Sequence, residues 1–124
     1  MRRVMRGLLA GAALLVGGSC VTPSIPLPPP GLEALSFGSP GPGKLVVMGN
    51  ADPANVGATF YVFDENHQAG AIQGTAPDGS FTTDPFDGEP GDAVQIWYQA
   101  KGEISQITTC VVTVGVQLNS TICH

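Results

Sequence analysis

The chain has 124 residues, a formal net charge of −5 and only 12% charged residues. Three of its five basic residues, Arg2, Arg3 and Arg6, lie at the extreme N-terminus. The rest of the chain has two basic residues, Lys44 and Lys101, and ten acidic ones. Nucleic-acid binding depends on Lys and Arg neutralising phosphates, and binding to anionic lipid depends on basic clusters. The composition therefore excludes both as side-chain functions.

The first segment is typical of a secretory signal peptide. The three arginines precede an uncharged apolar stretch, Gly7 to Val16, followed by Gly17, Gly18 and Ser19. Ten residues are too few to cross a bilayer, which needs about 20. A buried core helix is the alternative, but the N-terminal arginines argue against it, so residues 1–19 are predicted to be a signal peptide.

The residues before Cys20 resemble the lipobox of bacterial lipoproteins, in which the first mature residue is a diacylated cysteine. Gly18 and Ser19 match the pattern, whereas Gly17 stands where the family usually has Leu, and the apolar Val16 lies one position too early. The resemblance implies that Cys20 carries the acyl chains, of the palmitate type, that anchor the protein. Ordinary cleavage that leaves a plain cysteine is the alternative.

The chain has three cysteines. Export would place them in a compartment that permits disulfides, where an odd count leaves one thiol over. If Cys20 carries lipid, Cys110 and Cys123 remain as a pair, and we expect a disulfide between them. A metal site is the competing use, but no Cys-x-x-Cys and no nearby pair of histidines accompanies them.

The next segment is rich in proline. Seven of the eleven prolines lie between Val21 and Gly43, and proline lacks a backbone N–H and fixes φ. Residues 20–43 are therefore expected to join neither helix nor sheet and to form an extended, semi-rigid spacer. Leu32, Leu35 and Phe37 interrupt it and are candidates to dock on the following domain.

Residues 44–124 are predicted to form an all-β domain, a small antiparallel sandwich. No segment has apolar residues at helical spacing over three turns; short apolar runs alternate with turn signals instead. Pro77–Gly79 and Lys101–Glu103 are predicted turns, and Gly88–Asp92 a loop. The expected strands are Lys44–Asn50, Ala58–Asp64, Ala71–Ala76, Ser80–Asp84, Ala93–Gln99 and Ile104–Val114, with a last short run in "VQLNSTIC".

About half the chain resembles the small Ig-like modules of bacterial surface proteins and lipoproteins. Their pattern is Gly-Ala-x-Val-x-Val-x-Asp, then Asp-Gly-Ser-Phe, then Gly-Asp-x-Val-x-Val. The matching residues are Gly57, Ala58 and Asp64, then Asp78, Gly79, Ser80 and Phe81, then Gly91, Asp92, Val94 and Ile96. The resemblance implies an Ig-like β-sandwich and says almost nothing about activity, because such folds carry many functions.

This register assigns the two faces of the strands. Because side chains alternate along a strand, Phe60, Val62, Val94 and Ile96 should point into the core with Phe81. The aromatic side chains of Tyr61, Phe63 and Trp97 should then point outward, and a slip of one residue would reverse the assignment.

No enzymatic motif is present: no Gly-x-Ser-x-Gly, no His-Glu-x-x-His and no phosphate loop. The histidines, His67 and His124, are expected to be solvated and to lack the positioned partner that a catalytic base needs. We therefore expect a protein that is not an enzyme and has no cofactor.

Calcium is a weak candidate ligand. "DENHQAG", Asp64 to Gly70, has alternating oxygen-bearing side chains but lacks the closing Glu of a calcium loop, and a hydrophilic hairpin loop is the better interpretation. The nearby acids Asp84, Asp87, Glu89 and Asp92 offer oxygen ligands at one end of the sandwich, although acidic loops more often serve solubility.

The outward aromatics are the main functional candidate. If their strands pair, Tyr61, Phe63 and Trp97 form an exposed apolar patch of the kind that binds a partner protein or glycan. The alternative is that "VVTVGVQLN" or the Leu32–Phe37 stretch covers them.

The sequence as a whole predicts a non-enzymatic, lipid-anchored protein of the bacterial cell envelope, at the outer membrane or cell surface. It would display one Ig-like sandwich on a spacer for a structural, adhesive or partner-binding role. A small exported inhibitor or chaperone-like binder of a hydrolase or an assembling subunit is the second hypothesis, which an exposed edge strand would favour.

Overall fold

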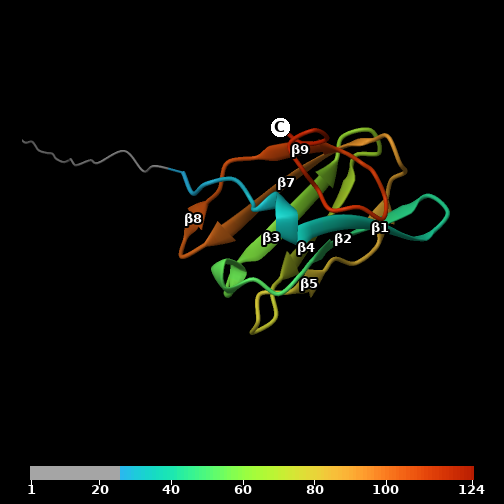
Figure 1. Ribbon diagram of the computed structural model, residues 1–124. Coiled ribbons are helices and arrows are strands. Elements are labelled where there is room, and N and C mark those ends of the chain that lie inside the picture. The colour runs from blue at the N-terminus through green and yellow to red at the C-terminus, as the bar shows by residue number, and fades with distance from the viewer. Residues whose placement is uncertain (1–25) are drawn as a thin grey trace, which may run out of the picture.

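A computed structural model describes residues 26–124, which form two antiparallel β-sheets packed as a sandwich (Figure 1). The predicted signal peptide (1–19) and Cys20 lie outside the described residues. Within the described part of the chain, no helix is long and apolar enough to cross a membrane. The elements are η2 (Leu32–Ala34), β1 (Leu35–Gly41), β2 (Lys44–Gly49), η3 (Pro53–Asn55), β3 (Thr59–Asp64), β4 (Ala69–Gly74), β5 (Phe81–Thr82), β6 (Phe86–Asp87), β7 (Ala93–Ala100), β8 (Glu103–Ile104) and β9 (Thr108–Val111).

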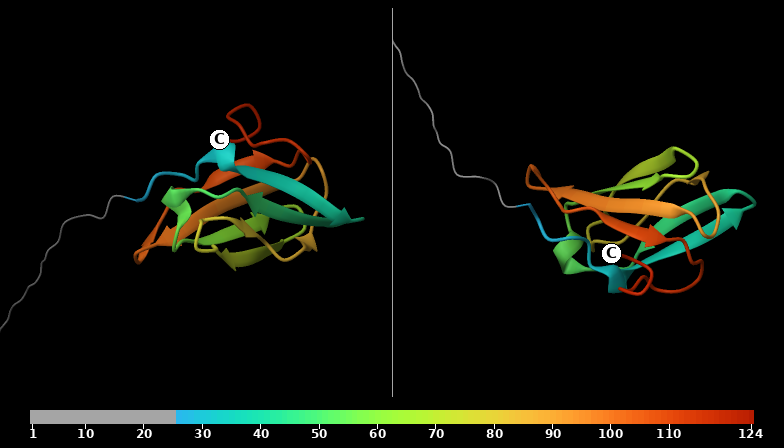
Figure 2. Two further views of the ribbon diagram at one scale, coloured as in Figure 1. Left: turned by 60° about the horizontal axis from the view of Figure 1, so that its bottom comes forward. Right: turned by 90° about the horizontal axis from the view of Figure 1, so that it is seen from above.

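The smaller sheet has β2 at its centre, with β1 on one side and the short strands β5 and β6 on the other. The larger sheet has the order β4-β3-β7-β8, and β9 also pairs with β7. The two views of Figure 2 show the smaller sheet lying across one face of the larger one. The prediction of an all-β sandwich of antiparallel sheets is confirmed.

The core lies between the inner faces of the two sheets, and the predicted register is confirmed. Phe60, Val62, Val94 and Ile96 are all buried, and the ring of Phe81 from the other sheet stacks on Phe60 with centroids 4.3 Å apart. This alternation follows from the period of two along a strand, since an apolar set on one face must meet the facing sheet.

The expectation that residues 20–43 join no sheet is wrong for Leu35–Gly41, which form β1 and pair with β2. Leu35 and Phe37 are fully buried, and Leu32 packs against the core, so the expected docking of these three residues is confirmed. Their burial offsets the cost of Pro40, which lies at the distal end of an edge strand, where the sheet tolerates a missing N–H.

The predicted strand Ile104–Val114 is divided in two. Residues 103–104 form β8, and β9 begins only at Thr108. Between them the Ser105 hydroxyl accepts a hydrogen bond from the Tyr98 amide at 2.9 Å, and the Ser105 amide donates to the Tyr98 carbonyl. This local arrangement interrupts the ladder and shifts the register between β8 and β9 by one residue.

The C-terminal tail joins the edges of both sheets. After β9 it passes along β1, where the amides of Gly115 and Leu118 donate to the carbonyls of Phe37 and Leu35. It then returns to β9, where Thr109 and His124 exchange two backbone hydrogen bonds. The run "VQLNSTIC" thus forms isolated bridges in place of the predicted strand.

A disulfide joins Cys110 of β9 to Cys123 of this tail, as the cysteine count predicts. Both cysteines are buried and belong to the core. The tail and its disulfide therefore close the side of the sandwich formed by β1 and β9.

Candidate functional site

The first candidate site is the outer face of the larger sheet. Tyr61 on β3 lies directly opposite Trp97 on β7, and their rings are nearly parallel with centroids 5.5 Å apart. Phe63 projects from the same face, two residues along β3. We call these three residues the aromatic face. The sequence predicted both their outward direction and the pairing of their strands.

The aromatic face borders a shallow depression of about 480 Å³ lined by sheet residues only. The smallest lining residues, Gly70 and Ala71, belong to β4, and Ile72 of the same strand is 67% exposed. The two segments expected as covers lie elsewhere: Leu32–Phe37 and the tail after β9 pair with each other along the edge of the smaller sheet. Within residues 26–124, neither segment lines the depression.

Uncharged polar groups surround the aromatic rings. Gln95 and Gln99 flank Trp97 on the same face of β7, and the Tyr61 hydroxyl donates to the Gln99 side-chain oxygen at 3.0 Å. The exposed apolar residues Ile104 and Val111 extend the face toward β8 and β9. An apolar face with amide groups and no central charge suits a neutral partner surface or a sugar ring.

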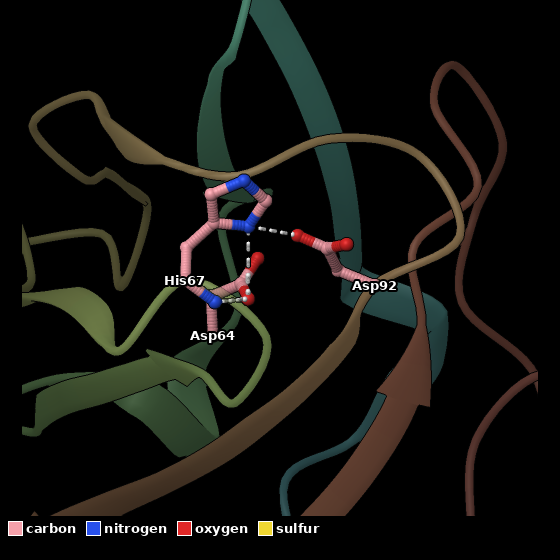
Figure 3. A group of neighbouring side chains, drawn as sticks. All are labelled: Asp64, His67 and Asp92. Atoms are coloured by element: carbon pink, nitrogen blue, oxygen red, sulfur yellow. Dashed lines mark hydrogen bonds and ion pairs between the residues drawn. The ribbon is translucent and has the colours of Figure 1, made fainter.

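The second candidate site lies where β3 ends and β7 begins. Asp64, the last residue of β3, and Asp92, just before β7, converge with His67 from the loop between β3 and β4 (Figure 3). We call these residues the Asp–His–Asp cluster. His67 Nδ1 donates to Asp92 Oδ2 at 2.7 Å and lies 3.6 Å from Asp64 Oδ1. One potential ligand atom from each residue lies within 4.8 Å of the others.

Local structure fixes the two carboxylates. Asp64 Oδ1 accepts from the backbone amides of Asn66 and His67, both at 2.9 Å, which closes the turn after β3. Asp92 Oδ2 accepts from the Glu89 amide at 3.1 Å. These bonds hold the two carboxylate side chains close together at the end of the sheet.

Asp64 is the unusual member of the cluster. Its side chain is fully buried, and its Oδ2 has no hydrogen-bond partner in the structure. Burial raises the pKa of Asp64, and the neighbouring carboxylate of Asp92 raises it further, against the opposing effect of the backbone amides. A buried acceptor without a partner costs about 1–3 kcal/mol, so it requires an explanation.

The pKa of Asp92 is lowered, and the pKa of His67 is raised. Burial raises the pKa of Asp92, but its contact with the Asp64 side chain and its hydrogen bonds with the Glu89 amide and with His67 outweigh burial and lower it overall. Partial burial lowers the pKa of His67, whereas the hydrogen bond to Asp92 and the charges of both aspartates raise it overall. The arrangement favours an ionised Asp92 beside a proton held on Asp64 or on His67.

The structure corrects the expectations for this loop. His67 is exposed, as expected, but it does have a partner, because its ring is hydrogen-bonded to Asp92. Glu89 Oε2 also lies 3.5 Å from His67 Nε2. Of the four calcium candidates, Asp92 and Glu89 lie beside His67, Asp87 forms an ion pair with Lys44, and Asp84 is exposed. The hairpin-loop interpretation of "DENHQAG" is confirmed, since β3 and β4 are paired neighbours.

The sequence contains a signal for this cluster that none of the motifs above captures. The alternation that places Phe60 and Val62 in the core also places Asp64 inward, and the same rule on β7 places Asp92 inward beside Val94. An inward acid at the end of each of two paired strands predicts that the acids meet. Only the position of His67 depends on loop geometry and could not be derived.

The edge of the larger sheet is a third feature. β4 pairs with β3 on one side, and no described strand pairs with its other side. Its sequence, "AGAIQG", has no charge and no proline, the usual means of protecting an edge.

Comparison of the chain with protein-family models, with curated proteins and with solved structures finds no match.

Proposed function

We propose that this protein is a non-enzymatic lipoprotein of the bacterial cell envelope, anchored through Cys20, whose Ig-like sandwich binds an envelope partner through the aromatic face. The partner is an uncharged glycan or the neutral surface of an envelope protein. The observation that carries the proposal is the stacked, partly exposed pair of Tyr61 and Trp97, which is flanked by glutamines and covered by no described segment.

The path of the chain supports display away from a membrane. Leu27 is bonded to Ile104 and Gln106, so the N-terminal segment leaves the sandwich beside β8. β8 pairs with the last residues of β7, whereas Asp64 lies opposite Val94 at the beginning of that strand. An anchor at Cys20 would therefore leave the aromatic face accessible and direct the opposite end of the sandwich outward.

The anchor is tested by the variant Cys20→Ser in cells that express the full chain. We expect the wild type in the membrane fraction, labelled by a palmitate analogue, and the variant in the soluble exported fraction without label. Cys110→Ser/Cys123→Ser, which keeps Cys20, serves as the matched control and should still be labelled. A variant that remains in the membrane fraction would refute the anchor.

Binding at the aromatic face has an intrinsic reporter, because Trp97 is the single tryptophan of the chain. Purified envelope polysaccharides and purified envelope proteins are titrated separately while Trp97 fluorescence is followed. We expect saturable quenching or a blue shift with one of the two classes, and Ile72→Ser should weaken that binding several-fold while leaving the reporter in place.

The matched control is Val116→Ser, which removes an exposed apolar side chain from the tail, away from the aromatic face. Trp97→Ala should abolish capture of the same partner on beads, at a cost of about 1 kcal/mol in stability from the lost aromatic pair. Equal weakening by Val116→Ser and Ile72→Ser, or capture unchanged in Trp97→Ala, would refute the proposed face.

A second function, inhibition or chaperoning by strand addition, is favoured by the open edge of β4. Its test is Gly74→Pro, which removes an amide that faces the open edge, because the next residue, Thr75, donates its own amide to Ala58 beside β3. Loss of partner binding in Gly74→Pro with retention in Ile72→Ser would favour strand addition over the aromatic face.

A further inference from the structure

We propose that the Asp–His–Asp cluster is a binding site for one divalent transition-metal ion of the Zn²⁺ type, with Asp64, His67 and Asp92 as its protein ligands. The proposal does not depend on the lipid anchor or on the aromatic face. It assigns a ligand to a cluster whose members come from the end of β3, the loop after it and the loop before β7, at the end of the sandwich opposite the N-terminal segment.

The first argument is the buried carboxylate oxygen without a partner. Asp64 is 0% exposed, and while Oδ1 is saturated by two backbone amides, Oδ2 has none. Figure 3 shows the Asp64 carboxylate turned toward the ring of His67 and the carboxylate of Asp92. A cation bound between these groups would supply the missing partner and remove the repulsion between two adjacent acids.

The second argument is the dimension of the cluster. The three potential ligand atoms lie within 4.8 Å of one another. Ligand atoms at about 2.0–2.2 Å from a zinc ion are separated by about 3.4 Å in a tetrahedral site. Side-chain adjustments of about 1 Å suffice, and the movable ligand is His67, whose side chain is 33% exposed on a loop.

The third argument selects the class of ion. One imidazole nitrogen with two carboxylates suits Zn²⁺ and its neighbours in the first transition row, whereas Ca²⁺ takes six to eight oxygen ligands. Three protein ligands leave a position for water. Glu89, 63% exposed and 3.5 Å from His67 Nε2, lies beside the far nitrogen of the ring, where it orients the imidazole.

Charge around the cluster favours cation entry. Glu89 is at its rim, and Lys44 is paired with Asp87. The second lysine, Lys101, lies in the turn between β7 and β8, at the opposite end of β7 from Asp92. No cation among residues 26–124 competes for the two aspartates except the protonated ring of His67 itself.

The test uses the protein purified without a polyhistidine tag in metal-free buffer at pH 7.5. Zn²⁺ alone is titrated by calorimetry, and Co²⁺ by its visible absorption, which is intense in a four-coordinate site. We expect one equivalent per chain and a rise in melting temperature with Zn²⁺. Binding should weaken at least about tenfold below pH 6, where protons compete for His67.

Three variants locate the site. His67→Gln should weaken Zn²⁺ binding at least about tenfold, whereas His124→Gln, the matched control at the chain's other histidine, should bind like the wild type. Asp64→Asn keeps the turn acceptor and should weaken Zn²⁺ binding as much as His67→Gln without lowering the melting temperature of the metal-free protein. This variant separates loss of metal from loss of fold.

The proposal is overturned if the wild type shows no saturable Zn²⁺ or Co²⁺ binding at about 100 μM. It is equally overturned if His67→Gln and Asp64→Asn bind like the wild type, or if His124→Gln alone abolishes binding. Binding of Ca²⁺ with no binding of Zn²⁺ would assign the cluster to a different ion and also overturn it.

Discussion

The disulfide between Cys110 and Cys123 should supply a large share of the stability of this domain. Replacing both cysteines by Ala opens a loop whose ends are 13 residues apart. In the chain-entropy model a loop of this size contributes about 3 kcal/mol by restricting the unfolded state. Small domains have a total of about 5–15 kcal/mol, so the free energy of unfolding should fall by a fifth to more than half.

The tail also has bonds of its own, which make the effect local as well as global. Thr109 and His124 exchange two backbone hydrogen bonds, and the Val111 amide donates to Ile122. Without the disulfide these bonds remain possible, but the tail can separate from β9 without global unfolding. We expect amide hydrogen exchange at Thr109, Val111 and His124 to approach that of an exposed loop, while Val62 on the central strand stays protected.

The assay is thermal unfolding of the wild type and the double Ala variant without reductant. A loss of about 3 kcal/mol corresponds to a decrease of about 12–24 °C in melting temperature for a domain of this size. Reductant should lower the melting temperature of the wild type toward that of the variant and leave the variant unchanged. A variant that melts within about 3 °C of the wild type, or free thiols in the untreated protein, would refute the reasoning.

Three further predictions concern individual positions. Asp64→Asn should leave the metal-free protein at least as stable as the wild type at pH 7, because the amide keeps the turn acceptor and replaces the buried oxygen that lacks a partner with a donor. Asp64→Ala should lower the free energy of unfolding by about 2 kcal/mol or more. Equal losses for the two variants in chemical unfolding would contradict this reasoning. Partial burial lowers the pKa of His67, but the neighbouring aspartates raise it overall. The stability contributed by the charged ring is therefore complete below pH about 6.5 and is lost as the pH rises through the raised pKa of the folded state. Melting temperatures from pH 6 to 9 should therefore fall in the wild type and not in His67→Gln, and parallel curves would count against the prediction. Gly70→Ala should destabilise by more than about 2 kcal/mol, because a Cβ there would lie 2.0 Å from the Val62 carbonyl oxygen, whereas Gly74→Ala on the same strand meets nothing within 4 Å and is the control.

The sequence by itself determined the elements that depend on local periodicity. Alternation along residues 58–64 and 93–99 placed Phe60 and Val94 inward and Trp97 outward, because the two faces of a strand are fixed once one face is buried. The cysteine count determined the disulfide, and the glycine of Lys101–Glu103 determined the turn after β7, where Gly102 has φ of 78°. Each of these follows from a rule that spans only a few residues or a simple count.

Only the tertiary structure decided the features that depend on contacts between distant segments. Leu35–Gly41 forms a strand in spite of Pro40 because burial of Phe37 outweighs the local preference for an extended spacer. The ring of His67 meets Asp92 across 25 positions of sequence, through a loop whose path no periodicity describes. The tail of residues 112–124 pairs first with β1 and then with β9, since both sheet edges offer unpaired backbone groups that local sequence cannot reveal.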